Sequence, residues 1–293
     1  MTDPAAVERD AAEAASAFSH PAVAPDATGA YGEHPDQVVD FYAPRAETPG
    51  GPVPLVAVLH GGAWRAPYDR RHITPFADFL ARRGFAVANV EYRRGSSLPH
   101  QHADGPVAGR WPETFDDVAA AMDALPELAA AALPQADVRR LVVTGHSAGG
   151  HLALWAAARH VLPYDSPWRL PSPPMLRGVV ALAPIADFTV AEELGVCGGA
   201  SAQLLGGEES FADRLPYADP AALLPTGIAT AVVQGRDDIV VPQQVAEAYV
   251  AAAAKAGEMV GLTLLDGIGH FPLIDPAADA CAVVSEEIAQ LAW

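Results

Sequence analysis

The sequence predicts an α/β fold with a mostly parallel central sheet, helices on both faces and a small lid formed by insertions. Short, continuously apolar segments alternate with segments of helical spacing along most of the chain. Continuous apolar runs are typical of strands buried on both faces, and their alternation with helices indicates right-handed crossovers within one sheet. The chain has 293 residues and 51% hydrophobic residues, which is sufficient for one sizeable core.

The predicted elements follow one another in a regular order. Strands are expected at residues 37–42, 55–59, 85–90, 141–143, 179–182, 231–233 and 262–265, the first as a weakly alternating edge strand. Helices are expected at 73–83, from Pro112 to beyond Leu125, and at 148–160, 243–255 and 276–291.

Two parts of the chain do not follow this alternation of strands and helices. Residues 1–35 are rich in alanine, proline and acidic residues. We expect them to form an N-terminal extension, a helix or cap followed by a loop, ahead of a single domain at 36–293. The Pro-rich segment 162–175 and the segment 187–225 are expected to form a lid, because insertions after strands usually lie over the carboxyl edge of such a sheet.

The charge and composition exclude several classes of function. Asp and Glu total 36 against 18 Lys and Arg, which gives a formal charge of −18 and predicts binding to neither nucleic acid nor a membrane. The N-terminus lacks the continuous apolar core of a signal peptide, and no apolar stretch approaches a membrane span. The two cysteines, Cys197 and Cys281, have no metal-like spacing and indicate reduced thiols. We therefore expect a cytoplasmic protein that uses no metal or other cofactor.

A glycine-flanked serine follows the predicted strand 141–143. Gly145 and Gly149 surround Ser147 in the pattern G-x-S-x-G, directly before a predicted helix. A strand-to-helix turn of this kind exposes the serine hydroxyl, and the helix N-terminus favours developing negative charge. The pattern predicts a nucleophilic serine.

A serine nucleophile needs a base and an acid that orients the base. On this type of sheet the chain order is serine, acid, histidine. Asp237 and Asp238 follow the strand at 231–233, and His270 follows the strand at 262–265. The order is met, and on spacing alone either aspartate is a candidate acid.

A glycine pair provides candidate oxyanion donors. Gly61 and Gly62 directly follow the strand at 55–59. Their backbone N–H groups are expected to face a cavity together with the N–H of Ala148. His60 is expected to hold this loop.

With these motifs in view, the sequence resembles an α/β-hydrolase of the esterase/lipase group that includes hormone-sensitive-lipase-like esterases and kynurenine formamidases. The matching pieces are HGGAW, EYR, GHSAGGH, GRDDIVVP and GHF, which extend from about residue 37 to the end. The resemblance implies that Asp238 is the acid. It also implies that Tyr92, Arg93 and Asp117 support the active-site loops. The form HGG-x-W departs from the three glycines usual in hormone-sensitive-lipase-like members.

The predicted function is hydrolysis of a small or medium carboxylic ester by Ser147, His270 and Asp238 through an acyl-enzyme. Trp64 and His146 are expected to contact the substrate, with Trp64 narrowing the acyl side. The alternative is an aryl formamidase that acts on an N-formylkynurenine-type amide, in which Trp64 and the lid aromatics stack on the ring. The lid aromatics in question are Trp111, Tyr164 and Trp168.

A third hypothesis is a non-catalytic protein that binds a small ligand on the same fold. Such proteins typically lack a triad member, whereas all three are present in this chain. The sequence does not indicate the oligomeric state.

Overall fold

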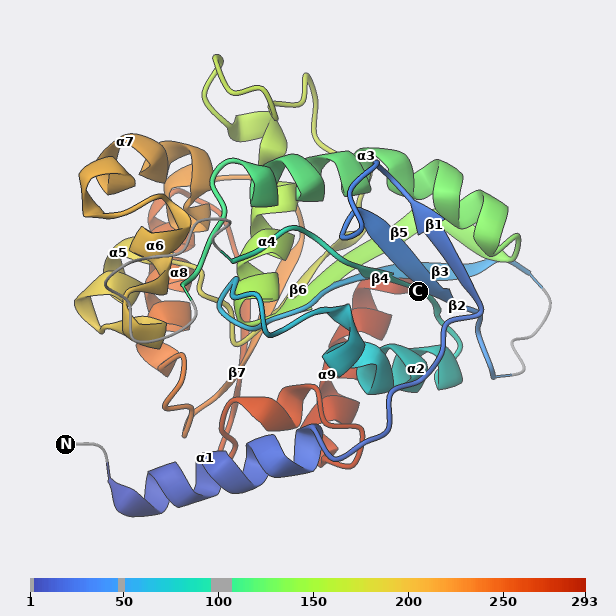
Figure 1. Ribbon diagram of the computed structural model, residues 1–293, viewed down its shortest axis with the longest axis horizontal. Coiled ribbons are helices and arrows are strands. Elements are labelled where there is room, and N and C mark those ends of the chain that lie inside the picture. The colour runs from blue at the N-terminus through green and yellow to red at the C-terminus, as the bar shows by residue number, and fades with distance from the viewer. Residues whose placement is uncertain (1–2, 47–50, 96–106) are drawn as a thin grey trace.

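The computed structural model describes residues 3–46, 51–95 and 107–293, which build a central sheet between two layers of helices (Figure 1). The eight strands lie in the order β1-β2-β4-β3-β5-β6-β7-β8. All neighbouring strands are parallel except β1 with β2 and β2 with β4. The strands are β1 (Ala27–Ala30), β2 (Val38–Tyr42), β3 (Val53–Leu59), β4 (Ala86–Val90), β5 (Ala136–His146), β6 (Gly178–Leu182), β7 (Thr230–Gly235) and β8 (Gly261–Leu265).

Helices cover both faces of this sheet, as the alternating pattern predicts. Figure 1 shows α3, α4 and α8 on one side and α2 and α9 on the other. The α-helices of the described residues are α1 (Pro4–Ala17), α2 (Thr74–Arg82), α3 (Glu113–Ala132), α4 (Ala148–Ala157), α5 (Phe188–Glu193), α6 (Ala200–Leu204), α7 (Glu208–Ala218), α8 (Gln243–Lys255) and α9 (Asp279–Ala292).

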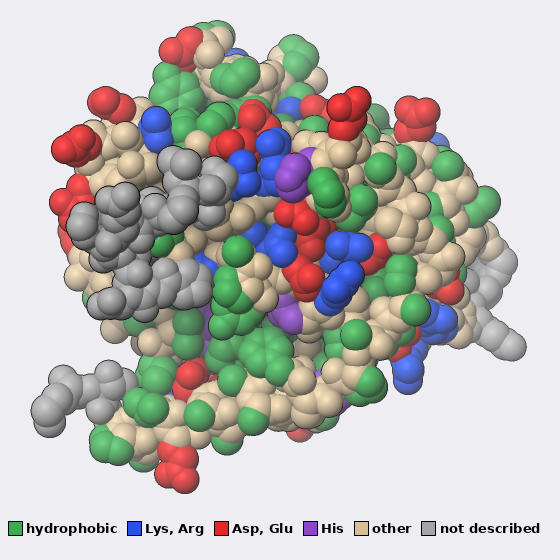
Figure 2. Space-filling view, in the orientation of Figure 1, with side chains coloured by type: hydrophobic (Ala, Val, Ile, Leu, Met, Phe, Trp, Pro, Cys, Tyr) green, Lys and Arg blue, Asp and Glu red, His purple; other side chains and the backbone are tan. Residues whose placement is uncertain are grey.

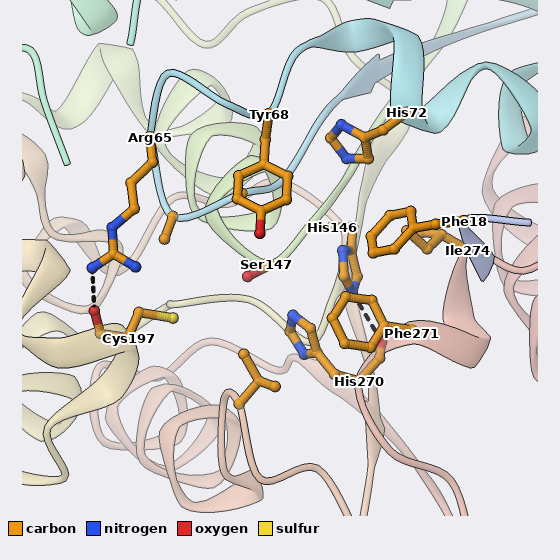
Figure 3. Close-up of a pocket in the computed structure, with 13 residues that line it drawn as sticks. Phe18, Arg65, Tyr68, His72, His146, Ser147, Cys197, His270, Phe271 and Ile274 are labelled. Atoms are coloured by element: carbon orange, nitrogen blue, oxygen red, sulfur yellow. Dashed lines mark hydrogen bonds between the residues drawn. The ribbon is translucent and has the colours of Figure 1, made fainter. Parts of the chain in front are cut away.

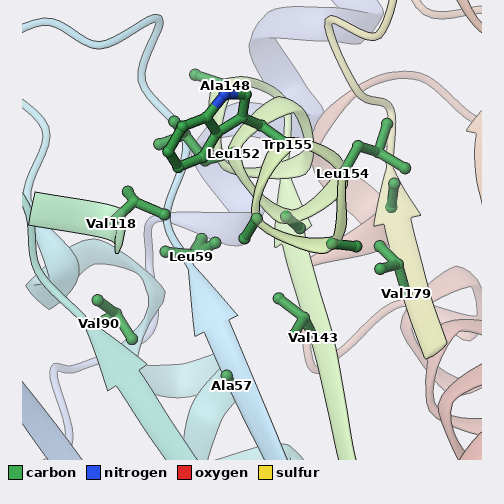
Figure 4. Close-up of a cluster of buried hydrophobic side chains, with 14 of the residues drawn as sticks. Ala57, Leu59, Val90, Val118, Val143, Ala148, Leu152, Leu154, Trp155 and Val179 are labelled. Carbon is green, nitrogen blue, oxygen red and sulfur yellow. The ribbon is translucent and has the colours of Figure 1, made fainter. Parts of the chain in front are cut away.

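The central strands are buried on both faces because their side chains alternate between two apolar layers. In β3, Leu59 packs in the layer that holds α3 and α4, while Val58 packs in the layer that holds α2 and α9. Figure 4 shows the first layer, where Leu152 and Trp155 of α4 face the ends of β3 and β5. This packing fixes the direction of α4 and therefore of the turn that precedes it.

The edge of the sheet differs from the sequence prediction. The N-terminal extension is predicted to end in a loop and residues 37–42 to form an edge strand, but β1 pairs with β2 and makes β2 an inner strand. The β1 sequence ATGA has no apolar run, and its side chains alternate between partly and fully exposed positions. Its pairing therefore depends on the partner strand, and the periodicity of β1 itself gives no signal.

The prediction that 162–175 forms part of a lid is wrong. This segment starts after α4 and ends before Gly178, the first residue of β6, and between these ends it packs on α3 and α4. Trp168 from this segment packs against Trp111 and Phe115. By contrast, 187–225 follows the carboxyl end of β6 and contains α5, α6 and α7.

The N-terminal helix α1 packs across the carboxyl-terminal part of the chain. It contacts the short helix at Phe271–Leu273 and lies near α9 in Figure 1. Among the described residues, no helix is both long enough and apolar enough to cross a membrane.

Candidate active site

Ser147 occupies a strained turn between β5 and α4. Its backbone has φ of 58° and ψ of −119°, in the region that L-residues seldom adopt. The Ser147 N–H donates to the carbonyl of Leu182 in β6 (2.8 Å), which anchors the turn to the neighbouring strand. The side chain is therefore held at the carboxyl edge of the sheet, as the G-x-S-x-G pattern predicts.

The flanking glycines let three segments meet at this turn. A Cβ at Gly149 would lie 2.0 Å from the carbonyl oxygen of Leu59, and a Cβ at Gly145 would lie 2.2 Å from the carbonyl oxygen of Gly149. Backbone atoms cannot move aside as a flexible side chain can. The two glycines are thus required for close packing of α4 on β3 and β5.

Replacing Gly149 with alanine is expected to lower the free energy of unfolding by about 3 kcal/mol or more, through overpacking against Leu59. Gly261→Ala is the matched control, because a Cβ there would meet its nearest atom at 3.7 Å. Urea denaturation followed by circular dichroism measures both. Equal midpoints for the two variants would contradict the requirement for close approach at Gly149.

His270 and Asp238 form a buried acid–base pair. His270 Nδ1 lies 2.7 Å from Asp238 Oδ2, and both residues are at most 5% exposed. Asp238 Oδ1 accepts the N–H groups of Val240 and Val241, each at 2.8 Å, and its other oxygen accepts from Gln234 Nε2. With the carboxylate fixed in this way, the Nδ1–H tautomer leaves His270 Nε2 free to accept a proton.

Asp237, the other candidate acid, faces away from this pair. Its side chain is 41% exposed and lies 3.6 Å from Arg9 Nη1. Arg9 also donates to the carbonyl of Asp237 at 2.9 Å. The structure places Asp238, not Asp237, against His270.

Ser147 and His270 line the same pocket (Figure 3). Its volume is about 160 Å³, and Figure 3 shows the His270 imidazole beside the Ser147 hydroxyl. The other described residues of its wall are Phe18, Gly62, Ala63, Arg65, Tyr68, His72, His146, Cys197, Val240, Phe271 and Ile274.

The oxyanion-loop backbone reaches this pocket through Gly62 and Ala63. Among the described residues, the amide N–H groups of Gly61, Gly62, Ala63 and Ala148 have no hydrogen-bond acceptor. Ala148 is the first residue of α4, so its amide is one of the unpaired donors of a helix N-terminus. Gly61, unlike Gly62 and Ala63, does not line the pocket, and a Cβ there would lie 2.8 Å from the carbonyl oxygen of His146. We therefore favour Gly62 and Ala63 over Gly61 as donors.

Comparison with known proteins agrees with this architecture. A family model described as BD-FAE matches residues 39–252, which is more than half of the chain. The chain belongs to the BD-FAE family of α/β-hydrolases. Solved structures with the same fold include a truncated carbohydrate esterase from gut microbiota, with a TM-score of 0.72, 18% identity and coverage of 91% of this chain and 96% of that one. Esterase B from Lactobacillus rhamnosis has a TM-score of 0.72, 19% identity and coverage of 98% and 92%.

Curated relatives match over only part of their own length. A probable isoprenylcysteine alpha-carbonyl methylesterase from Oryza sativa subsp. japonica is 25% identical over 251 residues, which are 82% of this chain and 56% of the relative. The non-reducing polyketide synthase stbA from Stachybotrys bisbyi is 34% identical over 118 residues, 40% of this chain and 5% of the synthase. The chain thus spans about half of the methylesterase and a small part of the synthase.

The expectation that Trp64 contacts the substrate is wrong for this BD-FAE member. Gly62 and Arg65 close a tight turn with a 3.0 Å hydrogen bond, and its two central residues, Ala63 and Trp64, have φ of 50° and 54°. A turn with two left-handed central residues reverses the chain sharply. It sends the Trp64 ring into the core, fully buried against Phe188, and away from the pocket.

Trp64→Ala is therefore expected to cost about 3–5 kcal/mol in stability. The ratio of kcat/KM for butyrate and acetate esters should stay within about threefold of wild type, because no pocket wall is removed. Tyr68→Ala is the control, since Tyr68 lines the pocket and is 43% exposed. If Trp64→Ala changes this ratio more than Tyr68→Ala does, Trp64 contributes to the pocket.

His146 lines the pocket but has a structural partner. Its Nε2 lies 2.9 Å from the carbonyl oxygen of His270. Burial, together with the proximity of His270, lowers the pKa of His146 well below its ordinary value, so the ring is neutral and donates this bond. His146 therefore holds the His270 loop in place, and its contact with the substrate stays a prediction.

A buried network fixes the oxyanion loop, as expected for His60. His60 Nε2 lies 2.8 Å from Glu91 Oε1, and its ring stacks on Tyr92. Burial alone would raise the pKa of Glu91, but His60 and Arg94 lower it to about 2. Nearby, Arg93 donates two hydrogen bonds to Asp117, which agrees with a supporting role for the EYR segment.

The lid aromatics predicted to stack on a substrate do not reach the pocket. Trp111 and Trp168 pack together near α3, and Tyr164 is 93% exposed. None of the three lines the pocket that holds Ser147. The other predicted lid segment, 187–225, does reach the pocket, because its Cys197 forms part of the wall.

Helix α1 supplies contacts that sequence reasoning did not find. Glu13 accepts the N–H of Gly269, directly before His270, at 3.0 Å. Phe18 lines the pocket and packs edge-on against Phe271. Arg9 donates to the carbonyl of Asp237, next to Asp238. Helix α1 therefore contacts both the loop that carries Asp238 and the loop that carries His270. No periodic signal in α1 identifies these contacts, because they join residues more than 220 positions apart.

No group of three or more His, Cys, Asp or Glu side chains within residues 3–46, 51–95 and 107–293 is arranged to hold a metal ion.

Proposed function

We propose that this protein is a serine hydrolase that cleaves a small carboxylic ester. The observation that supports this most strongly is the buried His270–Asp238 pair, 2.7 Å apart, in the same pocket as a strained Ser147. Membership of the BD-FAE family and the esterases among the structural neighbours support the same class of reaction.

The proposed reaction has two halves. Ser147 Oγ attacks the ester carbonyl carbon while His270 Nε2 takes the hydroxyl proton. The amides of Gly62, Ala63 and Ala148 donate to the oxyanion of the tetrahedral intermediate. The alkoxide then leaves with the proton from His270. Water, deprotonated by His270, releases the acid and restores Ser147.

The pocket favours small substrates. Its volume of about 160 Å³ is below the range of about 300–1,000 Å³ typical of drug-sized ligands. Phe18, Phe271 and Ile274 give one side an apolar wall. A short acyl group or a small alcohol fits these dimensions, and the rice relative's name, a methylesterase, agrees with a small leaving alcohol.

The aryl formamidase hypothesis loses the stacking aromatics on which it depended, since Trp64, Trp111, Tyr164 and Trp168 lie outside the pocket wall. It stays a prediction to be tested beside the ester reaction. The cytoplasmic location and the independence from cofactors likewise stay predictions of the sequence.

The test is a substrate panel: 4-nitrophenyl acetate, butyrate and octanoate, and N-formylkynurenine. We expect kcat/KM to be highest for acetate or butyrate and to fall at least tenfold for octanoate. Faster turnover of N-formylkynurenine than of every ester would favour the formamidase, and turnover of none would contradict a hydrolase.

A further inference from the structure

One cationic side chain lines the pocket without a carboxylate partner. Arg65 Nη2 donates to the carbonyl of Cys197 at 2.5 Å, and Arg65 Nε is buried with no hydrogen-bond partner. Within the described part of the chain, no carboxylate lies within 4 Å of this guanidinium. A buried guanidinium donor that lacks an acceptor is costly, so its retention requires a reason.

Several other partly buried arginines of the protein do pair with carboxylates. Arg70 pairs with Asp40 at 2.6 Å, Arg93 with Asp117 at 2.7 Å, and Arg159 with Asp123 at 2.7 Å. On the face shown in Figure 2, the Lys and Arg side chains are interspersed with Asp and Glu. Arg140, Arg169 and Arg214 instead donate to backbone carbonyls, as Arg65 does. Among the described arginines, only Arg65 combines this lack of a carboxylate with a place in the pocket wall.

The position of Arg65 gives the pocket two unlike ends. Figure 3 shows Arg65 and Cys197 on one side of Ser147, and Phe18, Phe271 and Ile274 on the other. Among the described residues, no Asp, Glu, Lys or Arg lines the apolar end. The Arg65 end offers a planar guanidinium, which suits bidentate recognition of a carboxylate.

The turn that buries Trp64 also places Arg65. Arg65 N–H donates to the carbonyl of Gly62, so the guanidinium and the proposed oxyanion donors belong to one turn. A group bound by Arg65 is thereby held at a fixed offset from the ester carbonyl. Such positioning raises kcat/KM because the reacting carbonyl is oriented as well as bound.

We propose that the substrate is an ester that also bears a carboxylate, and that Arg65 recognises this carboxylate. The inference rests on the proposed ester hydrolysis and specifies its substrate class. The protein as a whole carries a formal charge of −18, which disfavours anions at long range. The Arg65 guanidinium supplies a local positive charge, which favours an anion inside the pocket despite the negative charge of the whole protein.

The carboxylate lies on either the acyl or the alcohol side of the ester, and two substrate pairs distinguish these cases. On the acyl side, monomethyl glutarate is compared with its monoamide, methyl 4-carbamoylbutanoate. On the alcohol side, 3-acetoxybenzoate is compared with 3-acetoxybenzamide. Each pair differs in charge at nearly constant size, and acid release is followed by pH-stat titration.

In wild type we expect kcat/KM for the carboxylate to exceed that for the amide by at least about tenfold in one pair. Arg65→Gln should bring that ratio close to one, and Arg65→Lys should keep part of it. Arg139→Gln removes the same charge from an exposed position, 78% accessible, and should leave the ratio unchanged.

The ratio within each pair separates recognition of the carboxylate from a purely structural role of Arg65. If Arg65 only ties the oxyanion turn to Cys197, its loss lowers kcat/KM for both members of a pair equally, and an unchanged ratio in Arg65→Gln overturns the proposal. A wild-type ratio near one in both pairs overturns it too. Hydrolysis of neutral 4-nitrophenyl acetate reports on the ester reaction independently, so its absence contradicts the proposed function itself.

Discussion

Replacing Ser147 with alanine is expected to lower kcat/KM for ester hydrolysis by about 10⁴-fold or more, while the protein stays folded. The hydroxyl is the proposed nucleophile, and it lies in the same pocket as the buried His270–Asp238 pair. The oxyanion amides of Gly62, Ala63 and Ala148 would remain in the variant, so a small residual rate is expected. Initial rates with 4-nitrophenyl acetate measure the loss.

Ser285→Ala provides the control for this variant. Ser285 is also buried, but its hydroxyl bonds the carbonyl of Ala282 within α9 and does not line the pocket. We expect near-normal rates in this control. Near-normal hydrolysis by Ser147→Ala as well would exclude a mechanism that begins at this hydroxyl.

The second large effect is expected at Asp238. Asp238→Asn replaces an acceptor with an amide that cannot hold the Nδ1–H tautomer of His270, and the expected loss in kcat is about 10⁴-fold. Asp237→Asn should change kcat by less than about threefold, because Asp237 is 41% exposed and contacts Arg9 rather than His270.

Steady-state rates of both variants at pH 8 decide between the two aspartates. The two substitutions are chemically identical and one residue apart, so general damage to the loop affects both. A larger loss in Asp237→Asn would show that the acid is assigned to the wrong residue.

Much of the fold could be predicted from the sequence because strands that are buried on both faces have continuously apolar sequences. The β3 segment VPLVAVL is apolar throughout, and the structure buries all seven residues between two layers. The chain order Ser147, Asp238, His270 likewise follows from the order of the parallel strands that end beside one another. Choosing Asp238 over Asp237 required more than spacing, because two adjacent loop residues differ only in which way each side chain points.

The parts that sequence did not predict depend on turns and on distant contacts. Trp64 follows the glycine pair, but a turn with two left-handed non-glycine residues rotates it into the core. The same turn brings Arg65 to the pocket, where no motif marks it. Phe18 reaches Phe271 only because α1 packs across the His270 loop. Such contacts arise in the assembled tertiary structure and leave no periodic signal in either segment.

The central claim, that Ser147 is the nucleophile activated by His270, is tested most directly by covalent trapping. The protein is treated with ethyl 4-nitrophenyl methylphosphonate, whose phosphorus would bond to the serine oxygen while 4-nitrophenolate leaves. Peptide mass spectrometry then locates the label. We expect one phosphonyl group, on the peptide that contains Ser147, with loss of activity in proportion to labelling and slower labelling of Asp238→Asn. Complete inactivation with the label on any other residue, or persistent ester hydrolysis after Ser147 is fully labelled, would contradict this mechanism.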